Sequence, residues 1–344
     1  MSRTTSKTTS HHARTRTRAD RLAATLRRSL AVVTGSVVLA ASLTAGSTST
    51  ASAAATGQLS NGCSYSARGI PSCGAYLGAA IGANTDPAAF EAEMGKRMGV
   101  HRMYWRADQV ESAYRSAKAD LAKGRLPWIS FKMPYSWGEM ANGRGDAWTR
   151  NLATRLRSLP GPVWLAFHHE PEGDGNIQQW KAMQKRLAPI VRALAPNVGY
   201  SIILTGWDEL YGDPQFRLDA IWPDTKIDVA GFDVYNQYGV TRNGWTITKP
   251  TDMLGKYFKP LSAFAKAHNT AWGLAESGYS HKAASQYPSW LTSTYAELKS
   301  TGGVAFAYFN STLHSVAPWD ISTNVKRTDF RRALQSSTVI PPTG

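Results

Sequence analysis

Two glutamates in this 344-residue chain stand where short apolar runs end, and a pair of this kind could hydrolyse a glycosidic bond. The run 163–170 ends in Glu170, and the run 271–276 ends in Glu276. One carboxyl, kept protonated, gives its proton to the leaving oxygen, while the other, ionised, attacks the anomeric carbon. The pattern therefore indicates glycosidase chemistry, provided that the fold brings both carboxyls into one cleft. A structural ion pair is the alternative role for either residue.

The separation of the two carboxyls would decide the stereochemical course of such a reaction. A separation of about 5–5.5 Å gives retention by double displacement, whereas about 6.5–9.5 Å leaves room for a water molecule and inverts the product. The sequence does not fix this distance. Glu172 and Asp174 follow closely and are rival carboxylates, but Glu170 stands at the end of the run and is the preferred acid.

The elements that must position these residues form a regular alternation. Eight short runs are nearly continuous in apolar residues, as strands covered on both faces are, and most are followed by a helical pattern. Eight such units in about 290 residues predict a single-domain (β/α)8 barrel, whose active site lies at the carboxyl ends of the strands. An open doubly wound sheet is the alternative, but no glycine-rich phosphate turn follows the first run. The predicted strands are 76–81, 100–106, 126–133, 163–170, 198–207, 229–235, 271–276 and 304–310.

Residues 1–53 have the pattern of a secretory signal peptide. A basic stretch precedes an apolar run of small residues at 30–45, and Ala-Ser-Ala at 51–53 fits a cleavage site. The run falls short of the roughly 20 apolar residues of a membrane span, so a soluble, secreted, extracellular protein is expected, with a single-span anchor as the alternative. The arginine pair 27–28 suggests the twin-arginine export route. About half of the net charge of +15 lies in this segment.

The predicted barrel, residues 74–336, has short segments on both sides. Cys63 and Cys73 are the only cysteines of the chain and lie in the first segment, 54–73. In an exported protein a pair this close is most simply a disulfide, which would contribute about 2–3 kcal/mol if unstrained. The tail, 337–344, is rich in Ser, Thr and Pro and is expected to be a frayed terminus.

Three of the predicted strands end in distinctive short motifs. His169 directly precedes Glu170, the run 231–235 reads Gly-Phe-Asp-Val-Tyr, and Ala275 precedes Glu276. These motifs resemble those of glycoside hydrolase family 26, which belongs to clan A. The chain departs from the family directly after Glu170, where it has Pro-Glu-Gly-Asp in place of Met-Asn-Gly or similar. This departure leaves the substrate subclass open.

The resemblance, which covers roughly residues 74–335, implies a role for each matching residue. Glu170 would be the general acid/base and Glu276 the nucleophile of a retaining double displacement. Tyr235 would hydrogen-bond to the nucleophile, and His169 would lie near the acid and the sugar that is cleaved. An ionised Glu276 should raise the pKa of Glu170. An endo-β-1,4-mannanase is the commonest activity implied, while β-linked xylan or glucan stay open as substrates.

Aromatic side chains crowd the loops of the same rim and suggest an elongated sugar groove. The apolar faces of sugars stack on Trp and Tyr, although loop packing would also account for each single residue. Trp319, in the loop after the eighth run, is the strongest candidate for the cleavage subsite. Arg106 is a candidate hydrogen-bond donor to the nucleophile, with a structural ion pair as its alternative. The other candidate sugar-binding residues are Trp105, Trp137 and Trp207.

Other functions fit these residues less well. A metal hydrolase would need convergent ligands such as His-Glu-x-x-His, which the sequence lacks, so no metal or cofactor is expected. A non-catalytic polysaccharide-binding barrel would not need both glutamates, and a polysaccharide lyase is the further alternative. No nucleic-acid recognition motif accompanies the basic charge. The expected protein is a monomer that binds a polysaccharide and does not bind nucleic acid or, after signal cleavage, a membrane.

Overall fold

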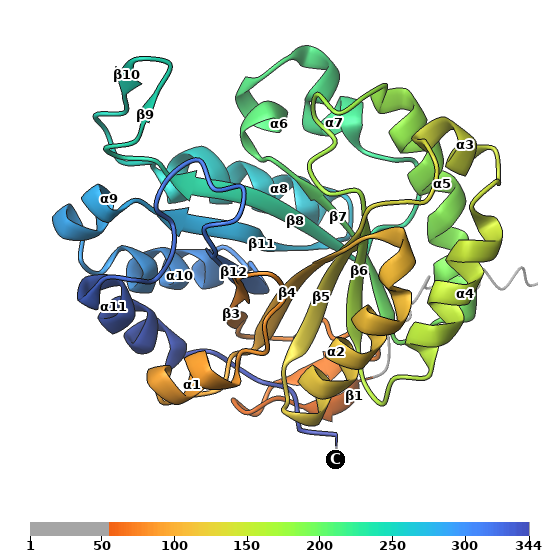
Figure 1. Ribbon diagram of the computed structural model, residues 1–344, viewed down its shortest axis with the longest axis horizontal. Helices are drawn as coiled ribbons and strands as arrows, with labels where there is room; N and C mark the ends of the chain where they lie inside the picture. The colour runs from red at the N-terminus through yellow and green to blue at the C-terminus, as the bar shows by residue number, and fades with distance from the viewer. Residues whose placement is uncertain (1–54, 344) are drawn as a thin grey trace, which may run out of the picture. The chain divides into compact units, whose positions relative to one another are not determined.

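The computed structural model, which describes residues 55–343, shows a closed barrel of eight parallel strands with helices around it (Figure 1). The predicted signal peptide, residues 1–53, lies outside the described residues. Strand β8 pairs with β11, and β12 pairs with β3, so the sheet has no edge. This closure confirms the (β/α)8 barrel and excludes the open sheet. In order around the barrel, the strands are β11 (Ala271–Tyr279), β12 (Ala305–Asn310), β3 (Tyr76–Ile81), β4 (Val100–Trp105), β5 (Leu126–Phe131), β6 (Val163–Phe167), β7 (Val198–Leu204) and β8 (Val229–Asn236).

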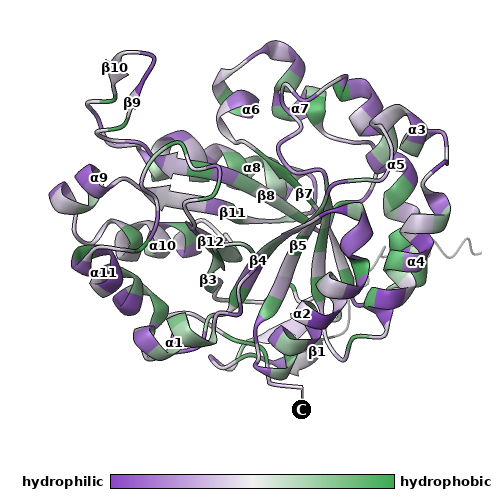
Figure 2. Cartoon of the chain, viewed as in Figure 1, coloured by the Kyte–Doolittle hydropathy of each residue, from purple (hydrophilic) through white to green (hydrophobic). Residues whose placement is uncertain are grey.

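Helices follow the strands and alternate hydrophobic with hydrophilic positions, seen as green and purple bands in Figure 2. In the part of the chain that the structure describes, no helix has the length and apolar character that crossing a membrane requires. The α-helices are α1 (Ala88–Met94), α2 (Val110–Ala122), α3 (Trp137–Ala141), α4 (Asp146–Arg157), α5 (Ile177–Leu194), α6 (Trp207–Tyr211), α7 (Leu218–Ile221), α8 (Lys259–Ala267), α9 (His281–Gln286), α10 (Trp290–Ser300) and α11 (Asn324–Leu334). Shorter turns are η1 (Ala107–Gln109), η2 (Pro214–Phe216) and the π-helical η3 (Leu254–Phe258).

Large side chains fill the interior of the barrel, and a glycine makes room for one of them. The rings of Trp128 and Trp164 are both fully buried and meet edge to face, with centroids 5.0 Å apart. A Cβ at Gly231 would lie 2.7 Å from the Trp128 ring and 2.9 Å from the Ala275 methyl group. A protein interior packed this closely has no room for an added methyl group. The glycine of the 231–235 run is therefore required by packing inside the barrel.

The segment before the barrel covers the amino-terminal ends of the strands. Strands β1 (Ala55–Gln58) and β2 (Ser64–Ser66) form an antiparallel pair, and the expected disulfide between Cys63 and Cys73 is present. At the start of β3, the Tyr76 hydroxyl donates a hydrogen bond to the carbonyl of Gly69 (3.0 Å). At the start of β6, the Trp164 indole donates to the carbonyl of Arg68 (2.8 Å). These bonds close the end of the barrel opposite the predicted site.

The expectation of a frayed tail at 337–344 is wrong for the described residues up to 343. The Thr338 N–H donates to the carbonyl of Ala75 (3.2 Å), and the Ser337 hydroxyl accepts the N–H of Leu77 (2.8 Å). The Ile340 side chain is buried. The polar composition of the tail is typical of a loop. Here, however, its small polar side chains and its backbone form hydrogen bonds with the backbone at the start of strand β3.

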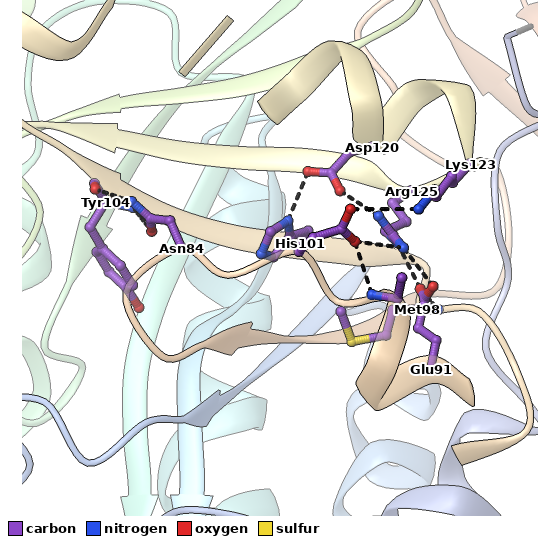
Figure 3. A network of polar contacts seen from close by, with 10 residues as sticks. Asn84, Glu91, Met98, His101, Tyr104, Asp120, Lys123 and Arg125 are labelled. Atoms are coloured by element: carbon purple, nitrogen blue, oxygen red, sulfur yellow. Dashed lines mark hydrogen bonds and ion pairs between the residues drawn. The ribbon is translucent and has the colours of Figure 1, made fainter. Parts of the chain in front are cut away.

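A buried ionic network fastens α1 and α2 to the barrel beside β4 and β5 (Figure 3). Arg125 grips Glu91 through two hydrogen bonds, of 2.7 and 2.6 Å, and donates a third to Asp120 (2.9 Å). The other oxygen of Asp120 lies 2.8 Å from Nδ1 of His101. One guanidinium thus compensates two buried carboxylates, and its removal would leave Glu91 without a cation and Asp120 with the His101 ring alone.

We predict that Arg125→Met lowers the free energy of unfolding by about 3–5 kcal/mol, because Glu91 and Asp120 then lack the guanidinium that pairs with them inside the protein. Urea unfolding measures this loss. Arg155→Met is the matched control: Arg155 holds Glu111 through a similar pair of bonds, of 3.0 and 2.9 Å, but in solvent, so little change is expected. Equal losses in the two variants would contradict the interpretation.

Candidate active site

A cavity of about 680 Å³ opens at the carboxyl ends of the strands, and it contains both predicted catalytic residues. Glu170 follows β6 and Glu276 lies on β11, yet both line this cavity. The fold therefore brings both carboxyls into one cleft, as the predicted chemistry requires. Among residues 55–343, no group of three or more His, Cys, Asp or Glu side chains is placed to hold a metal ion.

Two tyrosine hydroxyls hold the Glu276 carboxylate. Tyr104 donates to Oε1 and Tyr235 donates to Oε2, both at 2.8 Å. The Arg102 guanidinium lies 4.0 Å from Oε1 and 4.2 Å from the centroid of the Tyr104 ring. Burial and the adjacent Glu276 raise the pKa of each tyrosine well above 10, so both stay protonated donors. Two donors and a nearby cation thus fix the orientation of the Glu276 carboxylate, which suits a nucleophile.

The strand that carries Glu276 is locally irregular. Leu274 on β11 pairs with Phe232 on β8, but Glu276 pairs with Asp233, so Ala275 is an extra residue in the ladder. A bulge of this kind turns the side chains that follow it and is frequent beside active sites. The bulge brings Glu276 into the register that faces the cavity.

An asparagine fixes the position of Tyr104, as Figure 3 shows. The Asn84 amide donates to the Tyr104 carbonyl (2.6 Å) and accepts its N–H (2.9 Å). Asn84 itself has a left-handed backbone (φ 60°), which asparagine tolerates better than most residues. The loop after β3 thereby holds the end of β4, and with it one of the two donors to Glu276.

The backbone around Glu170 is strained. Both His168 (φ 50°) and Glu170 (φ 48°) are left-handed, a conformation that costs a non-glycine residue of order 1 kcal/mol or more. The Glu170 N–H donates to the carbonyl of Ile203 on β7 (2.9 Å), which anchors this turn to the barrel. The chain thus leaves β6 by a path that places the Glu170 side chain in the cavity.

The environment of Glu170 raises the pKa of its carboxyl to near neutrality. Burial first, and then the Glu276 charge, raise the pKa of Glu170 to about 7, against the opposing pull of Arg102. The pKa of the acid is raised in the direction that the sequence predicted. One cavity therefore holds a carboxylate gripped by hydroxyl donors and a second carboxyl that retains its proton, the pairing that acid-assisted displacement needs.

The two rival carboxylates are engaged elsewhere. Glu172 shares a hydrogen bond with Glu209, and burial with this neighbour raises the pKa of Glu172 to about 11, so it stays neutral. Asp174 accepts from His168 (2.9 Å) and faces Lys132 (3.7 Å). Neither rival lines the cavity.

A third carboxyl in the cavity, Asp233, was not singled out from the sequence as a site residue. It is buried on β8 and lines the cavity beside Glu276, and no side chain donates to either of its oxygens. Burial and the charges of Glu276 and Glu170 raise its pKa well above the usual range. A neutral Asp233 can donate a hydrogen bond into the cavity. Its position three residues before Asn236, at the end of a buried strand, was the available signal.

Two of the predicted aromatic residues line the cavity. The Trp319 ring lies against Tyr235, with centroids 4.8 Å apart and planes 32° apart. Its carbonyl accepts from the Tyr308 hydroxyl (2.6 Å) and from Lys326 (3.1 Å), which fixes the loop. Trp207 also lines the cavity and is largely exposed. Both present aromatic surface to the cavity.

The expected contact between Arg106 and Glu276 is absent, and this candidate is corrected. Arg106 lies beyond the end of β4, where its guanidinium faces Asp108 in solvent (3.4 Å). The cation beside Glu276 is Arg102, inside the barrel. Arg102 and Tyr104 are two residues apart on one strand and so share its inward face.

The remaining candidates, Trp105, Trp137 and His169, do not line the cavity. Trp105 and Trp137 are buried, and the Trp137 ring packs edge to face on His168, with centroids 4.7 Å apart. The His169 ring lies 5.4 Å from that of Tyr104. Burial lowers the pKa of His169 well below its usual range, so the ring is neutral. His169 therefore supports a residue that holds Glu276.

Comparison with solved structures finds a similar fold in a β-mannanase, an endoglucanase and a cellulose synthase subunit. A family 26 β-mannanase from Bacteroides ovatus is 17% identical over 77% of this chain and 90% of its own, with a TM-score of 0.54. An endoglucanase from Thermotoga maritima, solved with mannotriose, is 13% identical over 76% and 96%, with a TM-score of 0.54. The cellulose synthase subunit Z from Clostridioides difficile is 14% identical over 76% and 98%, with a TM-score of 0.55. No family model and no curated protein sequence matches the chain. At these identities the likeness establishes the fold.

The raised pKa of Glu170 has a consequence for stability. Its carboxyl binds a proton more tightly in the folded chain than in the unfolded chain, so its favourable contribution is complete below about pH 4 and is lost as the pH rises through about 7. We predict that Glu170→Gln, which stays neutral, raises the free energy of unfolding at pH 8 by up to about 3 kcal/mol relative to the parent, but not at pH 4.

Urea unfolding at the two pH values measures this difference. Glu93→Gln is the control, since Glu93 pairs with Arg327 at the surface (2.8 Å) and its loss should bring no gain at pH 8. A Glu170→Gln effect that is the same at both pH values would show that its carboxyl is not held protonated.

Proposed function

We propose that this protein is a secreted β-glycan hydrolase that works by retaining double displacement, with Glu170 as acid/base and Glu276 as nucleophile. The observation that carries the proposal is the shared cavity, in which two tyrosine hydroxyls hold the Glu276 carboxylate and the pKa of Glu170 is raised to about 7. The barrels with the same fold include a β-mannanase and an endoglucanase, and this supports a glycan as the substrate. The disulfide is in keeping with an oxidising compartment.

In the first step, Glu276 attacks the anomeric carbon while Glu170 transfers its proton to the leaving oxygen. A glycosyl ester forms on Glu276, and the aglycone departs as an alcohol. Tyr104 and Tyr235 keep the carboxylate oriented before attack. Each hydroxyl can stay hydrogen-bonded to its Glu276 oxygen while the negative charge of the carboxylate disappears. Arg102, which faces Oε1, opposes a rise in the pKa of Glu170.

In the second step, the same pair of residues exchanges roles. Esterification removes the Glu276 charge, which is the second largest cause of the raised pKa of Glu170. Glu170 has already given its proton to the leaving oxygen, so with a lowered pKa it stays ionised and acts as a base toward water. The water attacks the anomeric carbon, Glu170 takes its proton, and Glu276 leaves as the carboxylate. Two inversions give net retention.

The substrate that we propose is a neutral β-linked polysaccharide, with β-1,4-mannan first. This choice rests on the resemblance at strands β6, β8 and β11, and the departure after Glu170 keeps xylan and glucan as alternatives. The exposed Trp207 and the fixed Trp319 provide apolar surfaces for sugar rings on the cavity wall. We further propose that the enzyme acts as a monomer without a cofactor.

A polysaccharide panel with two glutamine variants tests this proposal. On the best of mannan, xylan and mixed-linkage β-glucan, Glu276→Gln should abolish activity, since amide nitrogen cannot form the ester. Glu170→Gln should lower kcat by about 10²–10⁴-fold, because acid assistance is lost. An aryl glycoside with a good leaving group needs no acid, so Glu170→Gln should still release its phenol in the first step.

Glu172→Gln is the matched control, two residues from the acid. Glu172 is already neutral in its bond to Glu209, and glutamine preserves a neutral donor there, so activity should change little. Full activity in both Glu170→Gln and Glu276→Gln would refute the assignment. Unsaturated, ultraviolet-absorbing products would instead indicate a lyase, and glycan binding without cleavage would indicate a binding barrel.

A further inference from the structure

A small hairpin stands after β8, and its turn fixes which residues face each other. Strands β9 (Thr241–Arg242) and β10 (Trp245–Thr246) are joined by Asn243 and Gly244, both left-handed (φ 49° and 79°). Asn-Gly in this conformation is the two-residue turn whose twist suits a hairpin. It sets Arg242 directly opposite Trp245 and Thr241 opposite Thr246.

The hairpin has one face toward the catalytic cavity and one away from it. Residues directly opposite in an antiparallel pair point to the same face. Thr241 and Thr246 join their hydroxyls on one face (2.7 Å), so Arg242 and Trp245 share the other. Arg242 lines the cavity, and so does Ile247. Ile247 is two residues after Trp245, so in an extended segment both point to the same face. The Trp245 indole therefore belongs to the cavity side of the hairpin, which Figure 1 shows as β9 and β10.

The exposure of this hairpin is not explained by folding. Trp245 is 82% exposed, and with Val316 (60%) and Trp207 (55%) it is among the three most exposed large apolar side chains of residues 55–343. Val316 and Trp207 line the cavity, and Trp245 shares a hairpin face with Arg242, which also lines it. The Arg242 guanidinium has no hydrogen-bond or ion-pair partner among the described residues. An apolar ring and a free cation on one face, continuous with a cleft, suit a ligand rather than the core.

We propose that Trp245 and Arg242 form a further sugar-binding subsite, which holds a distal unit of a neutral β-linked polysaccharide chain extending from the cavity. The proposal rests on the proposed function and adds a determinant of substrate length. The indole offers a flat apolar surface to a pyranose face, and the guanidinium donates hydrogen bonds to hydroxyl groups at the edge of the ring. The tight turn presents both groups in a fixed register, which limits the entropy lost on binding.

The test compares long and short substrates. Trp245→Ala should lower kcat/KM about tenfold on the polysaccharide that the parent cleaves best, mainly through KM. Hydrolysis of an aryl monoglycoside or disaccharide, too short to reach the hairpin, should be unchanged. Trp245→Phe should restore most of the loss because it keeps an aromatic face. An equal effect of Trp245→Ala on long and short substrates, or none on the polymer, would overturn the proposal.

Thr241→Val is the control for hairpin integrity. It removes the hydroxyl pair on the opposite face and leaves Arg242 and Trp245 in place. We expect no change of kcat/KM on the polymer. A loss as large as that of Trp245→Ala would show that kcat/KM on the polymer depends on the shape of the hairpin and not on the exposed ring. This result would also overturn the proposal.

A binding measurement separates this inference from the proposed activity. In the Glu276→Gln protein, iodide should quench the fluorescence of exposed Trp245, and the difference from Glu276→Gln/Trp245→Phe isolates that signal. Mannohexaose, xylohexaose or cellohexaose should protect the ring from iodide, whereas the matching disaccharide should not. Protection in a protein whose parent cleaves no glycan would refute the proposed function and keep the subsite. Cleavage of a hexasaccharide that gives no protection would refute the subsite alone.

Discussion

Two carboxylate charges close together in a partly buried cavity repel each other, and the candidate site depends on this constraint. Two hydroxyl donors and a guanidinium surround the carboxylate of Glu276. The neighbouring carboxyls then retain their protons: burial and the Glu276 charge raise the pKa of both Glu170 and Asp233. Burial makes the larger contribution at both carboxyls, and the Glu276 charge adds to it.

The barrel provides this arrangement through local departures from regular structure. Strand β11 inserts an extra residue before Glu276, and the chain after β6 adopts left-handed backbone at His168 and Glu170. Such features destabilise the fold locally and persist when the surrounding structure fixes them. Here the fixed surroundings include the densely packed interior around Trp128 and the ionic network of Arg125 at the other end of the strands. Stability and chemistry are therefore assigned to opposite ends of the same strands.

The sequence predicted the barrel well because its signal is repeated eight times. Each strand is short, apolar and followed by a helix or loop, so an error in one would not change the fold. The positions of Glu170 and Glu276 at strand ends were enough to bring them to one cavity. Arg102 and Tyr104 were missed because they lie within an apolar run, where their inward direction depends on strand alternation that a fully buried strand hides. The tail was misjudged because its bonds to β3 are set by tertiary contacts, and its composition resembles that of a loop.

Direct identification of the residue that bears the glycosyl ester tests the central claim most sharply. A 2-deoxy-2-fluoro glycoside of the preferred sugar, with a good leaving group, should form the ester and hydrolyse slowly, because fluorine destabilises the electron-poor transition state of both steps. Peptide mass spectrometry should then find one fluoroglycosyl group on the peptide that contains Glu276, and none in Glu276→Gln. Labelling at Glu170 instead, or turnover with inverted anomeric configuration and no labelled peptide, would contradict a Glu276 nucleophile.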